Sequence, residues 1–174
     1  MFFMTLTTHA LVGAAAASLF PSQPVLAFAA GFASHFAIDA LPHWDYRILS
    51  KEQEESDRLK DNMNTKSPLF LFDLLRIGSD AVLGTVLAVV LFSFSLFHLP
   101  WWFVILGAWA GILPDPLQFV YFKLRLKFME PLQRFHIWVQ KGRSIHPGPL
   151  IGLLLQAGLV ALIVSVLHVF PYHF

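Results

Sequence analysis

Long apolar segments, separated by short turns and one strongly polar stretch, dominate the pattern of this chain. Five segments are predicted as helices, and they cover residues 5–20, 24–41, 69–97, 101–121 and 149–170. A helix needs roughly 20 apolar residues to cross a bilayer. The first two segments are shorter than this, so we expect a compact hairpin in a thinned or protein-shielded environment. The pattern predicts an all-α membrane protein with a bundle of about five transmembrane helices.

Small residues and prolines predict where these helices begin, bend and pack. Thr7 or Thr8 is the expected N-cap of the first helix. A small-residue face at Gly13 and Ala17 predicts close contact with another helix. In the fourth segment, the prolines of GILPDP (residues 111–116) must kink or end the helix.

Two charged regions interrupt the apolar pattern. Residues 42–67 alternate acidic and basic side chains, which predicts a solvated polar loop or a short surface helix. Residues 123–143 are basic and rich in aromatic side chains. Within this basic segment a helix beginning near Pro131 would place Leu132, Phe135, His136 and Val139 on one face. We therefore expect one interfacial amphipathic helix in addition to the spans.

Composition places the chain among integral membrane proteins. Of its 174 residues 56% are hydrophobic and only 13% are charged, which favours a single membrane domain over residues 1–174. The absence of Cys excludes disulfides and thiolate metal sites. The net charge of +1 gives no indication of a nucleic-acid partner. No Lys or Arg precedes Arg47, so we expect the N-terminal apolar segment to be mature sequence rather than a cleaved signal.

The distribution of basic residues predicts an orientation in the membrane. Five of the 12 Lys and Arg residues lie in the polar loop, six lie in the basic segment, and the last is Arg76. The turns near residues 21–24 and 98–100 contain none. The positive-inside rule therefore predicts that both charged regions are cytoplasmic, with the N-terminus inside and the C-terminus outside the inner membrane.

Candidate chemistry is concentrated where the second apolar segment ends. His35, Asp39 and His43 are spaced four residues apart, so they lie nearly on one helical face. Such side chains are costly in lipid unless the protein satisfies them. Imidazole nitrogens and carboxylate oxygens are common ligands of divalent transition metals. A metal site explains the pattern, and a hydrogen-bonded cluster that caps a helix at the membrane surface is the alternative.

Other His and Asp residues are expected at the same cytoplasmic ends of the spans. They are His9, Asp45, Asp73, Asp80, Asp115, His136 and His146. Some have simpler explanations: Asp73 and Asp80 could flank Arg76 as intrahelical ion pairs, and Asp115 could cap the proline break. Their convergence from all five spans nevertheless favours a common site.

Three motifs resemble the membrane-bound metal-dependent hydrolase-like family, which is described as LexA-binding, inner-membrane-associated hydrolases. They are THALxG at residues 8–13, SHxxxDxxPHWD at residues 34–45 and GxLPD at residues 111–115. The HRGxTH segment of that family is missing, and RSIH at residues 143–146 is at best a partial counterpart. The resemblance implies a small multi-span protein with metal-dependent hydrolase activity.

The function predicted from these residues is metal-assisted hydrolysis of a phosphoester or lipid-linked substrate at the cytoplasmic face. The expected metal ligands are His9, His35, Asp39, His43 and Asp80, with Asp45, His136 and His146 as accessory residues. Asp115 or Asp73 would be the general base. The mixed donor set favours Zn²⁺ or Mn²⁺, and the basic segment suggests contact with membrane lipid head groups.

Two other functions fit parts of the pattern. A non-catalytic scaffold could use the same His and Asp residues to bind a structural metal. An ion- or proton-coupled transporter would need polar residues along a path through the membrane. The outer halves of the predicted spans contain few polar residues, notably Ser93, Ser95 and Gln156, which disfavours transport.

Overall fold

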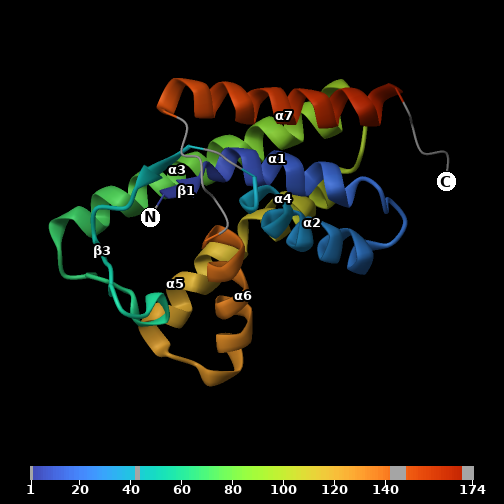
Figure 1. Cartoon of the computed structure of the whole chain (residues 1–174). Helices are drawn as coiled ribbons and strands as arrows, with labels where there is room; N and C mark the ends of the chain where they lie inside the picture. The colour runs from blue at the N-terminus through green and yellow to red at the C-terminus, as the bar shows by residue number, and fades with distance from the viewer. Residues whose placement is uncertain (1, 42–43, 142–147, 170–174) are drawn as a thin grey trace.

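Helix α1 (Leu6–Ala17) lies at the centre of a nearly all-helical fold, in contact with four other helices. The computed structural model describes residues 2–41, 44–141 and 148–169. The four neighbours of α1 are α2 (Pro24–Asp39), α3 (Pro68–Val89), α4 (Trp101–Ile112) and α7 (Pro149–Val169). In Figure 1 α7 runs alongside α1, whereas α5 (Pro114–Leu124) and α6 (Glu130–Lys141) extend away from these helices.

Glycines allow α1 to approach its neighbours closely. A Cβ atom added at Gly13 would lie 2.5 Å from the carbonyl oxygen of Gly107, and one at Gly84 would lie 2.6 Å from Cα of Thr7. These separations are shorter than a methyl group tolerates. Both α3, which contains Gly84, and α4, which contains Gly107, therefore contact α1 through backbone atoms. The small-residue face predicted at Gly13 and Ala17 is confirmed as a helix contact, because Ala17 also packs against Gly107.

The helix bend predicted at GILPDP is also confirmed. α4 ends at Ile112 and α5 begins at Pro114, and the two helices are bent by 48°. The bend turns α5 away from the helices that pack around α1. The chain then passes through a 3₁₀ turn, η3 (Lys127–Met129), into α6. The basic segment therefore does contain an amphipathic helix, and its predicted face is confirmed in part. His136 and Val139 are buried as predicted, whereas Phe135 is exposed, and Gln133 and Ile137 are buried in addition.

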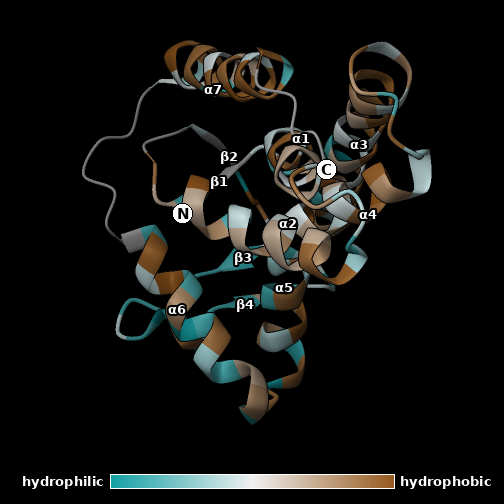
Figure 2. Cartoon of the chain, turned by 90° about the vertical axis from the view of Figure 1, so that its right-hand side faces the viewer, coloured by the Kyte–Doolittle hydropathy of each residue, from teal (hydrophilic) through white to brown (hydrophobic). Residues whose placement is uncertain are grey.

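The polar loop and the N-terminus contain short strands that the sequence pattern did not predict. β1 (Phe2–Met4) pairs antiparallel with β2 (Asp45–Arg47), and β3 (Lys51–Glu52) pairs antiparallel with β4 (Asn62–Met63). A 3₁₀ turn, η1 (Arg58–Lys60), lies between β3 and β4. These ladders are too short to produce a recognisable alternating pattern. β3 is hydrophilic, in contrast to the hydrophobic α7 (Figure 2).

The long apolar helices indicate membrane association. α3 continues through a π-helix, η2 (Val90–Ser95), to give 28 residues, and α7 has 21; both are long and apolar enough to cross a membrane. The bent pair α4 and α5 adds a third span if it is counted as one. α1 and α2 have 12 and 16 residues, or about 18 and 24 Å at the usual rise, which is less than a typical hydrocarbon core. The five predicted spans are therefore not confirmed.

The N-terminus of α1 shows that the predicted cap at Thr7 or Thr8 was wrong. The N-cap is Thr5, and the side chain of Asp80 on α3 accepts hydrogen bonds from the backbone N–H groups of Leu6 and Thr7 at 2.6 and 3.2 Å. Asp80, 73 positions after Thr7, thus supplies the hydrogen-bond acceptor that a local N-cap side chain would have provided.

The close approach of α3 to α1 predicts a specific effect of substitution. Gly84→Ala should destabilise the protein by about 1–3 kcal/mol, because the added methyl group meets backbone atoms of α1. Gly78→Ala in the same helix is the matched control, since no atom lies within 4 Å of its added Cβ. Thermal unfolding in one detergent measures the difference. Equal melting temperatures for the two variants would contradict the packing described here.

Candidate metal centre

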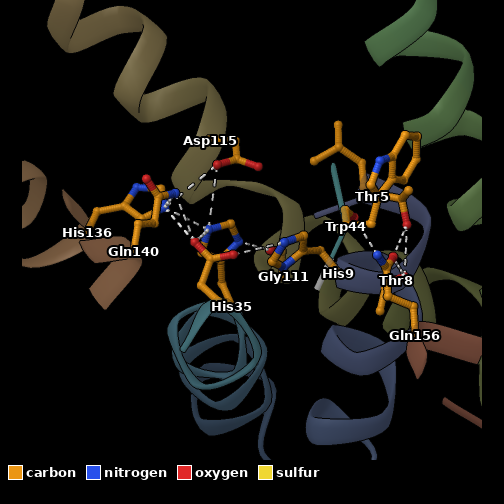
Figure 3. A network of polar contacts seen from close by, with 12 residues as sticks. Thr5, Thr8, His9, His35, Trp44, Gly111, Asp115, His136, Gln140 and Gln156 are labelled. Carbon is orange, nitrogen blue, oxygen red and sulfur yellow. Dashed lines mark hydrogen bonds and ion pairs between the residues drawn. The ribbon is translucent and has the colours of Figure 1, made fainter. Parts of the chain in front are cut away.

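Five buried or nearly buried His and Asp side chains meet where α2 ends. We refer to them as the His/Asp cluster: His9 from α1, His35 and Asp39 from α2, Asp115 from α5, and His136 from α6. Figure 3 shows His9, His35, Asp115 and His136 converging from their different helices. The side chains of His35 and His136 are completely buried, and that of Asp115 is 14% exposed. The cluster therefore lies inside the protein, with one carboxylate at its edge.

His35 is held in one orientation by the bend between α4 and α5. Its Nδ1 donates a hydrogen bond of 2.8 Å to the carbonyl oxygen of Gly111. A ring that donates from Nδ1 has, in its neutral form, an unprotonated Nε2 with a free lone pair. This second nitrogen points toward His136 and the two carboxylates. The geometry thus presents His35 as a metal ligand with a carbonyl partner, the arrangement common in metalloproteins.

Asp39 connects three helices through its carboxylate. One oxygen, Oδ1, lies 3.4 Å from His9 Nε2. The other, Oδ2, lies 3.1 Å from His136 Nε2 and accepts a hydrogen bond of 3.0 Å from the amide of Gln140. The His9 ring also stacks on the His35 ring, with 4.1 Å between centroids. A buried carboxylate is costly without such partners, and imidazole and amide groups supply them here.

The distances around the centre fit a metal coordination shell. His35 Nε2 lies 3.1 Å from His136 Nε2. From Asp39 Oδ2 these two nitrogens lie 3.6 and 3.1 Å away, and from Asp115 Oδ1 they lie 3.6 and 3.7 Å away. Ligand atoms bonded to zinc at about 2.0–2.1 Å in a tetrahedron are separated by about 3.3 Å. These buried His and Asp groups could therefore hold a metal ion.

His9 belongs to a second group of the same kind. Its ligand atom and those of His35 and Asp39 lie within 4.8 Å of one another, as do those of His35, Asp115 and His136. The two groups share His35. Five of the residues predicted from the sequence to form or assist a site are thus brought together, and His136, predicted only as an accessory residue, lies at the centre.

Asp73 and Asp80 lie away from the cluster and make structural contacts. Asp73 is completely buried and accepts hydrogen bonds from the backbone and side chain of Ser50 at 2.7 and 2.8 Å. It also lies 3.3 Å from Arg76, as the alternative ion-pair interpretation predicted. Asp80 caps α1, and the hydroxyl of Tyr46 donates a further hydrogen bond of 3.3 Å to it. Neither residue occurs in the two groups of potential ligands.

The remaining predicted residues lie outside the described part of the site. His43 and His146 fall outside the described residues. Asp45 belongs to strand β2, but its side chain is likewise not described.

Gln140 is a member of the site that sequence analysis missed. Its amide nitrogen lies 3.0 Å from both Asp39 Oδ2 and His136 Nε2. Its position four residues after His136 places both side chains on the same face of α6. That spacing is visible in the sequence. Gln140 was not predicted because its neutral amide is a weaker metal ligand than imidazole or carboxylate.

Asp115 also lines a pocket. This pocket, which we call the Asp115 pocket, has a volume of about 190 Å³ and lies between α3, α5 and the polar loop. Two ionisable groups of the loop line it. Burial lowers the pKa of Lys51, although the adjacent Asp61 carboxylate opposes that effect. Burial and the charge of Asp80 raise the pKa of Tyr46, so its hydroxyl stays protonated as a donor.

Comparison of the chain with protein-family models, with curated proteins and with solved structures gives no match.

The geometry predicts that purified protein binds a divalent metal through the His/Asp cluster. Asp39→Ala should lower metal affinity by at least about tenfold, because it removes a ligand and leaves the buried imidazoles without their acceptor. His168→Ala is the matched control, since His168 is exposed on α7 and contacts Phe97 instead. Metal content after dialysis against Zn²⁺ or Mn²⁺ measures both variants. Unchanged occupancy in the Asp39→Ala protein would show that the cluster is a hydrogen-bonded network without metal.

Proposed function

We propose that the protein is a membrane-embedded, metal-dependent hydrolase that cleaves a phosphoester. The main support is the set of five distances between potential ligand atoms, all from 3.1 to 3.7 Å. A second support is the position of Asp115, whose Oδ1 lies 3.6 and 3.7 Å from His35 and His136 and which also lines the Asp115 pocket. A substrate in this pocket would reach the metal centre without displacing the buried residues.

Each residue of the cluster then has a distinct role. His35, His136 and Asp39 are buried and would hold the ion, which we propose to be Zn²⁺ or Mn²⁺. A bound divalent ion lowers the pKa of water and polarises a phosphoryl oxygen. His9 contacts the far oxygen of Asp39 and orients the carboxylate.

Asp115 is placed to act as the general base. It takes a proton from the water that attacks phosphorus, and a new oxygen–phosphorus bond forms. As the bond from phosphorus to the alcohol oxygen breaks, protonated Asp115 returns the proton to the departing alcohol. The carboxylate ends in its starting state, and the products are an alcohol and a phosphate. The partial exposure of Asp115, unlike the burial of Asp39, suits a group that must exchange protons with substrate and solvent.

A structural metal site in a non-catalytic scaffold is the second candidate. Four protein groups surround the centre, and structural zinc sites are usually closed by four protein ligands. If Asp115 is a ligand rather than a base, no position remains for water. The two candidates differ in what the Asp115 carboxylate does, so its substitution distinguishes them.

The resemblance to membrane-bound metal-dependent hydrolase-like proteins agrees with this proposal. Motif residues of the resemblance include His9, His35, Asp39 and Asp115, all members of the His/Asp cluster. We also propose that the chain has five spans in the inner membrane. The polar loop, the basic segment and the His/Asp cluster would then lie at the cytoplasmic side, where anionic lipid head groups attract basic side chains.

The proposed orientation predicts the accessibility of two serines. Ser56→Cys in the polar loop, which precedes α3, should resist a membrane-impermeant thiol reagent added to intact cells. Ser95→Cys lies at the end of η2, at the far end of the same long helix, and should react. Both serines are exposed, and the chain contains no cysteine, so each variant has a single thiol. Mass spectrometry after labelling reports the result. Labelling of Ser56→Cys from outside would contradict the cytoplasmic site.

The proposed base predicts loss of turnover without loss of metal. Asp115→Asn should lower the hydrolysis of a generic phosphoester by about 10²–10⁴-fold, because the amide keeps the shape but cannot accept a proton. Asp57→Asn is the control, since Asp57 only caps the η1 turn. Turnover with Zn²⁺ or Mn²⁺ and metal content are measured on the same samples. Full activity in Asp115→Asn, or no metal-dependent activity in the native protein, would favour the scaffold.

A further inference from the structure

The Asp115 pocket has an almost entirely apolar wall. Leu6, Ile48, Met63, Ile77 and Phe122 line it from α1, the polar loop, α3 and α5. Its volume of about 190 Å³ exceeds that of an engineered apolar cavity of about 150 Å³ that binds benzene. A water-filled pocket with such a wall is unfavourable, and apolar ligands are favoured. The pocket thus suits a segment of hydrocarbon chain.

Besides Asp115, four polar side chains line the pocket, those of Tyr46, Lys51, Asp73 and Gln118. Tyr46 hydrogen-bonds to Asp80, and Asp73 accepts hydrogen bonds from Ser50. Gln118 is one helical turn after Asp115 on α5, is only 2% exposed, and its amide nitrogen has no hydrogen-bond partner among the described residues. Lys51 lines the same pocket with a side chain that is 3% exposed, and it pairs with Asp61 at 3.1 Å. An amide donor and a buried ammonium group beside a metal centre favour an oxygen-rich anion.

One wall of the pocket reaches the outer surface of α3. Leu74 lines the pocket and is also 53% exposed on the apolar face of that helix. Phe70 and Phe119 also line the pocket and form a stacked pair, with 6.0 Å between ring centroids. α3 belongs to one of the two helices long and apolar enough to cross a membrane. A hydrocarbon chain could therefore pass from the pocket to lipid without crossing polar surface.

We propose that the Asp115 pocket binds a single-chain lipid phosphate. The hydrocarbon chain lies between α3 and α5, and the phosphate lies at Asp115, within reach of Gln118, Lys51 and the His/Asp cluster. The pocket accommodates only part of a long chain, and the remainder extends along the exposed face of α3. This inference names the substrate class of the hydrolase proposed above and rests on that function for its catalytic meaning, although the binding itself does not require turnover.

A phosphonate probe tests the binding independently of hydrolysis. Octylphosphonate with a diazirine on its terminal carbon has no ester bond to cleave, and light attaches it to the residues around its chain. With the full-length protein in lipid nanodiscs, we expect labelling at Phe70, Leu74 and Phe119, identified by mass spectrometry. Unlabelled octylphosphonate should compete at lower concentration than either octanol or inorganic phosphate, because neither carries both groups that the pocket recognises.

A matched pair of variants tests the location. Leu74→Trp places a larger side chain in the pocket wall and should weaken competition by octylphosphonate about tenfold, corresponding to the loss of about two buried methylene groups. Leu75→Trp is the control, because Leu75 is 64% exposed on the same helix and does not line this pocket. Both positions are exposed, so neither tryptophan must enter the protein core.

The outcomes separate this proposal from the proposed hydrolase. Pocket labelling that responds to Leu74→Trp supports the binding site even if no phosphoester is hydrolysed. Labelling spread over the outer faces of α3 and α7, unchanged by Leu74→Trp, overturns the pocket proposal even if the protein is an active hydrolase. Equal competition by octanol and octylphosphonate also overturns the pocket proposal, because the phosphonate group would then contribute nothing to binding. Equal competition by inorganic phosphate and octylphosphonate does the same, because the hydrocarbon chain would then contribute nothing.

Discussion

The buried carboxylate of Asp39 imposes the requirement on which the arrangement of the helices depends. Removing a carboxylate from water costs several kcal/mol unless partners replace its solvation, and Asp39 is only 2% exposed. Its partners come from α1 through His9 and from α6 through His136 and Gln140. These helices must therefore meet at the end of α2. Backbone contacts such as that between Gly13 and Gly107 bring α1 and α4 close enough for this meeting.

The bend after α4 serves both the His/Asp cluster and the Asp115 pocket. Gly111, in the last turn of α4, offers its carbonyl oxygen to His35, and Asp115, in the first turn of α5, faces the cluster and the pocket. Hydrogen bonds then attach the polar loop to α5. Arg125 donates to the carbonyl oxygens of Leu59, Lys60 and Asp61. The loop is thus a wall of the pocket as well as a polar connection between α2 and α3.

Sequence analysis predicted those parts of the site that depend on local spacing. The four-residue interval between His35 and Asp39 placed them on one helical face, and the prolines around Asp115 predicted the bend. Contacts between distant segments were not predictable in this way. Nothing in the sequence near Asp80 indicates that it caps α1, because that hydrogen bond depends on how α3 packs. The buried face of α6 was predicted only in part, since His136 and Val139 are buried but Gln133 rather than Phe135 joins them.

The same limits apply to the membrane arrangement. Hydropathy located α3 and α7 well, because long apolar helices have a strong pattern. For α1 and α2 the pattern was equally apolar, but their length depends on the turn at Pro21–Pro24 and on the polar cluster at the end of α2. Their apolar character reflects burial within the protein as much as contact with lipid, as the fully buried Ala10 and Ala17 of α1 illustrate.

X-ray absorption spectroscopy of the zinc-loaded protein tests the central claim most directly, because it reports the atoms bound to the ion. The account predicts a shell of nitrogen and oxygen at about 2.0–2.1 Å with the outer scattering of two imidazole rings, reduced to one ring in His136→Ala. A spectrum without imidazole scattering, or one unchanged in His136→Ala, would show that the ion does not lie between His35 and His136.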